Sequence, residues 1–147
     1  MARPKGALRV TFVSPGGLRV SLPLLRTLRS VVRKIGAQEK SSGAIQIMWT
    51  DDAAMRLLNK TYRHLDKTTD VLSFLMNEDG VVGDIVISVE KAKRQAPRFH
   101  NTPSRELIRL AVHGVYHLLG YDHHRTREAV QMRAREKWAM AHARGGA

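Results

Sequence analysis

Four of the seven histidines in the chain lie within the stretch HGVYHLLGYDHH, residues 113–124. His113 and His117 are four residues apart, so a helix would place both on one face, one turn apart. Two imidazoles in that arrangement can bind a single metal ion. Gly120 lets the chain leave the helix and turn back, which allows His123 to supply a third ligand. Three histidines that leave a fourth position for water are typical of a catalytic zinc site, so we predict one Zn²⁺ per chain.

An ordinary structural role is the alternative for each of these histidines. A single histidine on a partly apolar helix more often packs in the core or lies at the surface than binds a metal. The helical pair, the glycine stop and the returning histidine together favour the metal site. His124 could replace His123 as a ligand, but we expect it to lie at the surface or to contact substrate.

Gly114 separates this stretch from the zinc proteases. In their motif H-E-x-x-H, the residue after the first histidine is the glutamate that acts as general base. Glycine cannot take up a proton, so the sequence disfavours a protease of that type. The nucleophile must then come from the metal's own water or from a base elsewhere in the chain.

The chain is strongly basic, with a formal net charge of +12. Its first 40 residues contain nine Lys and Arg against one acidic residue, whereas residues 41–112 are close to neutral. This charge favours a polyanionic partner such as nucleic acid, and a basic surface with no specific anion is the alternative. The absence of cysteine excludes disulfides, thiolate zinc ligands and a thiol nucleophile.

We expect a cytoplasmic protein that does not associate with membranes. The basic N-terminal residues are not followed by the apolar segment of a signal peptide. No apolar run approaches the roughly 18 residues of a membrane-spanning helix.

Hydrophobic periodicity predicts four strands and about five helices in one α+β domain that covers residues 1–147. We expect a mixed, mostly four-stranded sheet packed against these helices, with the zinc site at the end of a central helix. The strands are expected at residues 8–13, 44–50, 69–76 and 84–90, and the helices around 25–35, after Asp51, over 91–96, from Pro103 to Gly120 and over 126–143. The expected core-facing residues are Ala54, Leu57 and Leu58 on the second helix, and Ala129, Val130, Ala134, Trp138 and Ala141 on the last.

The stretch from His113 to His123 resembles the signature H-G-x-L-H-L-x-G-Y-D-H of the YbeY family, the single-domain bacterial metal-dependent endoribonucleases of ribosomal RNA maturation. Tyr116 in place of Leu is the one departure, at a position that should pack. The resemblance implies that His123 is the third zinc ligand, and it leaves His124 outside the motif.

A second stretch, NKTYRHLDKTTDVLSFL at residues 59–75, is similar to the family pattern N-x-x-Y-R-x-x-D-x-P-T-D-V-L-S-F-P. Thr68 and Leu75 replace its two prolines, which should loosen the loop and the strand end without changing the chemistry. GDIVIS at residues 83–88 is a third match. The resemblance extends over about residues 45–138, in the same order.

The resemblance implies cleavage of single-stranded RNA, 3′-end maturation of small-subunit ribosomal RNA, and a part in ribosome quality control. Its implied partners are ribosomal RNA, the small ribosomal subunit, and associated proteins or GTPases. Two alternatives remain open. The chain could be a ribosome assembly factor with a mainly structural zinc, or a metal-dependent hydrolase of a substrate other than RNA.

Arg63 is the candidate catalytic residue. It matches a family arginine tied to activity, and its permanently charged planar group fits a phosphate whose negative charge grows in the transition state. A structural ion pair with Asp66 or Asp70 is the alternative.

Three acidic residues and three tyrosines are further candidates. Asp70 and Asp84 could orient ligands or a water, and Asp122 is expected in a turn or beside the ligands. The tyrosines could stack on bases, although packing is the expected role for each of them: Tyr62, Tyr116 and Tyr121.

Overall fold

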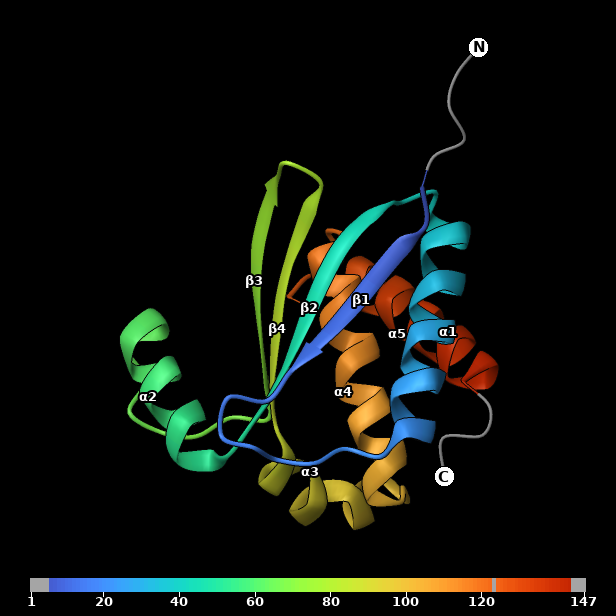
Figure 1. The fold of residues 1–147 in the computed structure, drawn as a ribbon. Coiled ribbons are helices and arrows are strands. Elements are labelled where there is room, and N and C mark those ends of the chain that lie inside the picture. The colour runs from blue at the N-terminus through green and yellow to red at the C-terminus, as the bar shows by residue number, and fades with distance from the viewer. Residues whose placement is uncertain (1–5, 123, 144–147) are drawn as a thin grey trace.

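Four strands form one mixed sheet in the computed structural model, which describes residues 6–122 and 124–143. They are β1 (Leu8–Val13), β2 (Gly43–Thr50), β3 (Val71–Glu78) and β4 (Val81–Ser88), in the spatial order β1-β2-β4-β3. β1, β2 and β4 are parallel, and β3 returns antiparallel beside β4. β3 is therefore an edge strand (Figure 1), and the predicted α+β fold with a four-stranded mixed sheet is confirmed.

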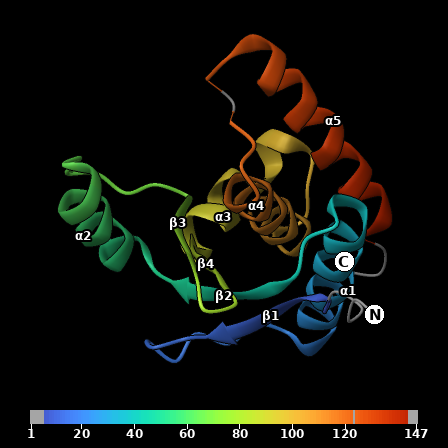
Figure 2. The ribbon, with the colours of Figure 1, turned by 90° about the horizontal axis from the view of Figure 1, so that it is seen from above.

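In the described part of the chain, five α-helices accompany the sheet. They are α1 (Leu22–Glu39), α2 (Asp52–Arg63), α3 (Val89–Gln95), α4 (Pro103–Leu118) and α5 (Thr126–His142), and a short 3₁₀ helix spans Ala96–Phe99. α1, α4 and α5 lie together on one side of the sheet, whereas α2 stands apart from them (Figure 2). Within the described residues, no helix is long and apolar enough to cross a bilayer.

Alternation along β4 divides the core into two unequal parts. Ile85 and Ile87 are fully buried in the main cluster, together with residues of α1 and α4. Val86 points to the opposite face, as expected for a neighbouring strand residue, and packs with Met55 of α2 and Leu72 of β3 in a much smaller cluster. α2 therefore packs on the opposite face of the sheet from α4.

α4 is the central helix that carries the histidine pair. The side chain of Thr102 accepts a hydrogen bond from the Arg105 backbone N–H at its start, and Pro103 occupies the first turn. The chain leaves the helix through Gly120, whose φ of 102° is strained for other residues. Both helix ends agree with the signals in the sequence.

Gly114 allows α4 to approach the sheet closely. A Cβ atom at this position would lie 2.9 Å from Cγ2 of Ile85. Position 114 thus faces β4, and the packing itself requires glycine where the proteases have a catalytic glutamate.

The predicted core faces of α2 and α5 are confirmed only in part, since Leu58 packs against the small cluster and Trp138 against the main one. On α2, Leu57 is 66% exposed and the buried residues are Met55 and Asn59. On α5, the buried residues are Met132 and Ala139, with Ala143 just beyond the helix, whereas Val130 is 52% exposed and Ala134 and Ala141 are exposed. Alanines and charged residues occur on every side of α5, so hydrophobic spacing alone does not define its inner face.

Candidate active site

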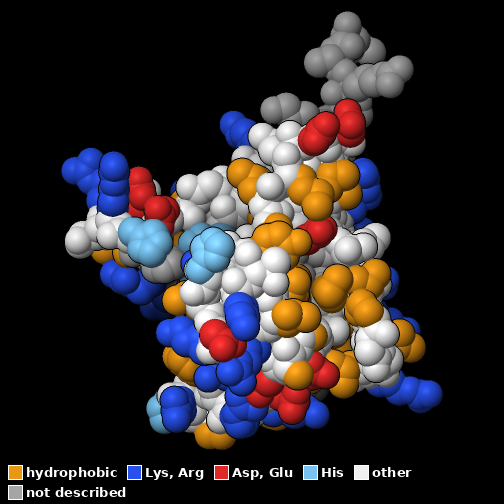
Figure 3. All heavy atoms as spheres, turned by 90° about the vertical axis from the view of Figure 1, so that its left-hand side faces the viewer, with side chains coloured by type: hydrophobic (Ala, Val, Ile, Leu, Met, Phe, Trp, Pro, Cys, Tyr) orange, Lys and Arg blue, Asp and Glu red, His pale blue; other side chains and the backbone are white. Residues whose placement is uncertain are grey.

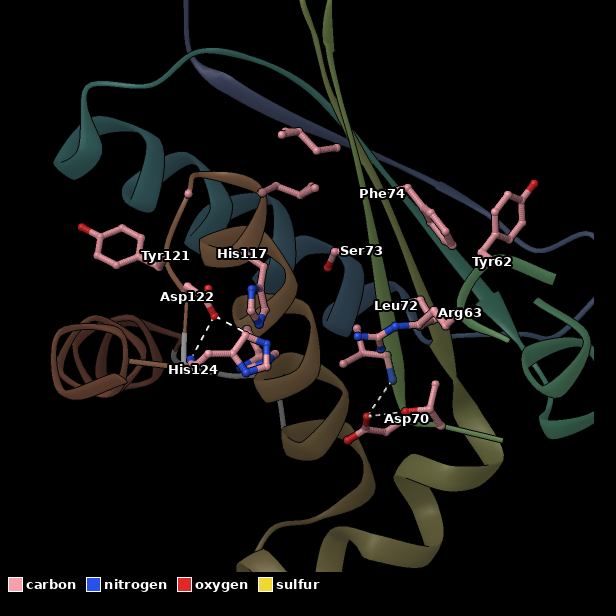
Figure 4. Close-up of a pocket in the computed structure, with 16 residues that line it drawn as sticks. Tyr62, Arg63, Asp70, Leu72, Ser73, Phe74, His117, Tyr121, Asp122 and His124 are labelled. Carbon is pink, nitrogen blue, oxygen red and sulfur yellow. Dashed lines mark hydrogen bonds and ion pairs between the residues drawn. The ribbon is translucent and has the colours of Figure 1, made fainter. Parts of the chain in front are cut away.

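A cleft of about 860 Å³ lies between the C-terminal half of α4 and the C-terminal end of α2, along edge strand β3. His113, His117 and the loop after α4 line one wall. Tyr62 and Arg63 of α2 line the other, and residues 69–75 form the floor (Figure 4). The fold thus brings together two of the motifs singled out in the sequence.

His113 and His117 lie side by side on α4, as their spacing predicts. Their ring centroids are 4.6 Å apart, with an angle of 78° between the ring planes. Every residue from Leu110 to Leu118 is buried except these two, which are partly exposed. This half of the helix is therefore packed on all sides except where the two imidazoles meet the cleft.

Glu136 of α5 supports His113, and this contact was not foreseen from the sequence. Its Oε1 lies 2.6 Å from His113 Nδ1, and both side chains are largely shielded from solvent. A carboxylate can only accept this hydrogen bond, so Nδ1 carries the proton and Nε2 of the neutral ring has the lone pair. A carboxylate that fixes a histidine in this way is typical of metal-binding histidines.

The return loop after α4 brings Asp122 and His124 to the same wall. The backbone N–H of His124 donates to Asp122 Oδ1 at 3.0 Å, so Asp122 holds a turn. Asp122 and His124 both line the cleft (Figure 4), and the His124 side chain is 73% exposed. His123, the predicted third ligand, lies outside the described residues.

Tyr121 ties the return loop to α1. Its hydroxyl donates to Glu39 Oε1 at 2.5 Å. Burial, together with this hydrogen bond to Glu39, raises the pKa of Tyr121 above its ordinary value. The phenol is therefore protonated at neutral pH and does not serve as a base.

Arg63 ends α2 and extends over β3 into the cleft, toward the wall that carries His117 (Figure 4). The acidic partners considered from the sequence are engaged elsewhere. Asp66 pairs with Arg56 at 2.8 Å, and Asp70 accepts hydrogen bonds from the Val71 N–H and Gln95. In the described part of the chain, no carboxylate forms an ion pair with Arg63.

Asp70 lies on the floor of the cleft and is held by a buried polar network. Gln95 Nε2 donates to Asp70 Oδ2 at 3.1 Å and to the fully buried Glu106 at 2.7 Å. Arg109 binds both carboxylate oxygens of Glu106, at 2.8 and 2.6 Å. These hydrogen bonds to Glu106 raise the pKa of Arg109, which therefore remains charged. Glu106 in turn holds Gln95, and Gln95 holds Asp70.

Asp84 does not lie with the other candidate residues in the cleft. It alternates with Ile85 on β4 and therefore points to the face of the sheet that packs against α2, opposite the histidines. It is not among the residues that line the cleft.

The surroundings of the cleft are basic. Lys60, Arg63 and Lys67 are exposed on and after α2. Seen from this side of the molecule, histidine side chains are exposed beside groups of Lys and Arg side chains (Figure 3). A polyanion approaching the cleft would meet positive charge on this face.

The donor set fits zinc. Imidazole nitrogen is a preferred zinc ligand, two imidazoles meet at one point of the cleft wall, and Glu136 fixes one of them in the ligating tautomer. In the described residues alone, no group of three or more possible ligands gathers at one point. The predicted set requires His123 to complete it.

Comparisons with known proteins agree with the motifs. The family model described as endoribonuclease YbeY matches residues 20–144. The endoribonuclease YbeY of Moorella thermoacetica is 43% identical over 133 residues, covering 80% of this chain and 85% of the relative. That of Aquifex aeolicus is 51% identical over 83 residues, which is 54% of this chain and 55% of the relative.

A solved structure shares the fold. The solution structure of TM1509 from Thermotoga maritima superposes with a TM-score of 0.67 at 26% identity, covering 92% of this chain and 88% of that one. The sequence match spans most of the chain, including both walls of the cleft. The chain therefore belongs to the YbeY family of endoribonucleases.

Proposed function

We propose that this chain cleaves single-stranded RNA with the help of one zinc ion, and that residues 1–147 act as one catalytic domain. His113, His117 and His123 would hold the ion. The observation that carries the proposal is the placement of Arg63 and the histidine pair on opposite walls of one cleft. A phosphate between them would contact a metal on one side and a guanidinium on the other.

The residues around the bound phosphate would have separate roles in cleavage. A bound zinc ion supplies Lewis acidity, which activates water near neutral pH and polarises a phosphoryl oxygen. Glu136 holds the His113 ring in its ligating orientation through Nδ1. Arg63 binds the phosphate oxygens and neutralises the charge that grows on them during cleavage. Asp70 keeps a carboxylate at the cleft floor, where it can orient a water molecule or a ligand.

The proposed substrate is ribosomal RNA, cleaved during 3′-end maturation of the small-subunit rRNA. The basic charge of the chain supports an RNA substrate, and the open cleft supports access to an unpaired strand. We extend the proposal to ribosome quality control, to the small ribosomal subunit with its proteins or GTPases as partners, and to the cytoplasm as the location.

An assay of RNA cleavage with and without chelator tests this function. The purified protein is incubated with an unpaired RNA and, as a control, with DNA of the same sequence. We expect cleavage of the RNA alone, loss of cleavage after chelation, and recovery when zinc is added back. Cleavage that survives complete zinc removal would contradict the proposal.

The same experiment separates the proposal from a structural zinc. Structural zinc sites are closed by four protein ligands, whereas this histidine pair lines an open cleft. We therefore expect the chelated protein to retain its fold by circular dichroism while it loses cleavage. If the metal-loaded protein binds RNA but leaves it intact, the role in assembly is favoured instead.

A further inference from the structure

The three tyrosines considered for base stacking differ sharply in the structure. Tyr116 is fully buried, and Tyr121 is partly buried with its hydroxyl bonded to Glu39. Tyr62 is 63% exposed and lines the cleft. Tyr62 is therefore the tyrosine whose ring is available to a ligand.

The position of Tyr62 follows from the geometry of α2. It comes three and seven residues after Asn59 and Met55, which are buried against the sheet, so it continues their face of the helix. At this end of α2 the Tyr62 ring contacts Phe74, which lies at the edge of the small hydrophobic cluster. It packs edge to face on Phe74 of β3, with ring centroids 5.2 Å apart and an angle of 66° between the planes. Phe74 thus fixes the ring orientation while most of the Tyr62 side chain remains in solvent.

Tyr62 directly precedes Arg63. The aromatic pair lies beside the start of the Arg63 side chain, which extends from there across β3 toward the histidine wall (Figure 4). Along an RNA strand each phosphate is followed by a base, so a cation and an adjacent aromatic ring match one nucleotide unit. Aromatic faces bind unpaired bases of any identity because every base has a π-face.

We propose that Tyr62, supported by Phe74, is a nucleobase-stacking subsite that holds the unpaired base next to the phosphate bound by Arg63. This inference rests on the proposed function, because it places RNA in the cleft. A base inside a duplex is stacked between its neighbours and does not offer its face to the ring. The subsite would therefore favour unpaired strands and discriminate little among the four bases.

Binding of a fluorescent RNA tests the subsite without relying on cleavage. The probe is a short unpaired RNA that contains 2-aminopurine, whose fluorescence is quenched by stacking, and it is titrated with zinc-loaded protein. Tyr62→Leu keeps an apolar side chain but removes the π-face, and we expect about tenfold weaker binding with loss of the quenching. Tyr62→Phe keeps the ring and should bind as the wild type does.

Leu57→Ala is the matched control, because Leu57 is an equally exposed apolar residue of α2 that does not line the cleft. We expect it to leave binding and quenching unchanged. Circular dichroism and thermal unfolding of each variant show whether the fold is retained. If a folded Tyr62→Leu binds and quenches as the wild type does, or if Tyr62→Phe loses as much as Tyr62→Leu, the subsite is wrong.

The failure of the subsite and the failure of the nuclease give different results. Wild-type protein that binds and quenches the probe but cleaves no RNA would overturn the proposed function and leave the subsite standing. Wild-type protein that cleaves RNA, with an unchanged KM in Tyr62→Leu, would overturn the subsite and leave the nuclease standing. Wild-type protein that does not bind the probe overturns the subsite.

Discussion

The two walls of the cleft are supported in different ways. α4, which carries the histidine pair, is buried along most of its length in the main core, and α5 reaches it from behind through Glu136. α2, which carries Tyr62 and Arg63, rests on the small cluster of Met55, Leu72 and Val86. It stands apart from α1, α4 and α5 (Figure 1).

Polar contacts hold α2 mainly at its beginning. The Asp52 carboxylate accepts hydrogen bonds from Ser88, Thr68 and Arg94, at 2.7, 3.2 and 2.5 Å. Further along the helix, the buried Asn59 donates to the Lys67 carbonyl at 2.9 Å. The comparison teaches that the wall with the histidine pair is fixed by the core, whereas the wall with Tyr62 and Arg63 is held at the start of α2 and extends its C-terminal end over β3.

Removal of a metal ligand should have the largest effect. In His117→Ala we expect loss of bound zinc and a fall in RNA cleavage of at least about a thousandfold, because the Lewis acid is lost. Atomic absorption of the purified protein measures the zinc. His124→Ala is the control and should retain its zinc, since His124 lies outside the family motif. A full complement of zinc in His117→Ala would refute the ligand assignment.

Gly114→Ala tests how closely the histidine wall depends on the core. The added Cβ would lie 2.9 Å from Ile85, so the substitution should lower the free energy of unfolding by about 1–3 kcal/mol. Urea unfolding measures this change. Gly16→Ala is the matched control, because a Cβ there meets no atom within 4 Å, and it should change the stability little. Equal stability of the two variants would argue against a tightly packed α4.

Glu136→Ala tests the support of His113 from α5. We expect zinc affinity to fall about ten- to a hundredfold, because the ring loses the partner that fixes its tautomer and orientation. Competition with a zinc-binding dye measures the affinity. Glu128→Ala removes the same charge from α5 without removing the contact to His113, and it should bind zinc normally. An unchanged affinity in Glu136→Ala would show that the contact has no role in metal binding.

Asp52→Asn tests the tether of α2 and should have the smallest effect, a loss of about 1 kcal/mol at neutral pH. Burial alone would raise the pKa of Asp52, but the hydrogen bonds from Arg94, Ser88 and Thr68 outweigh it and lower the pKa below its ordinary value. A lowered folded-state pKa stabilises the fold above about pH 4 and loses this contribution as the pH falls through the folded-state value. Urea unfolding should therefore show a difference between wild type and variant at neutral pH that shrinks in acid. A difference that is independent of pH would contradict this origin.

Much of the histidine wall could be predicted from the sequence because its residues and the signals that place them are close together in the chain. The spacing of His113 and His117, the cap at Thr102 and the exit at Gly120 all lie within one helix and its ends. Hydrophobic alternation likewise predicted three of the strands, and β-branched and aromatic composition predicted β3. The position of Arg63 opposite the histidines is different, since it depends on how β3 and α2 pack. It entered the prediction only through the family resemblance.

Glu136 was missed for a related reason. It contacts His113 across the packing of two helices, and no spacing along the chain encodes that contact. A signal was nevertheless present on α5, where Glu136 interrupts the series of Met132, Ala139 and Ala143 that faces the core. A carboxylate within a buried series needs a polar partner, and His113 is that partner. The weak apolar pattern of α5 concealed this series.

The central claim is that the two walls do separate jobs, and Arg63→Ala tests it most directly. The measurement is the zinc content and the rate of RNA cleavage of the same purified sample. We predict zinc at the wild-type level, one ion per chain, together with cleavage slowed at least about a hundredfold, because the guanidinium acts on the phosphate and not on the metal. Unchanged cleavage, or loss of zinc together with activity, would contradict the account.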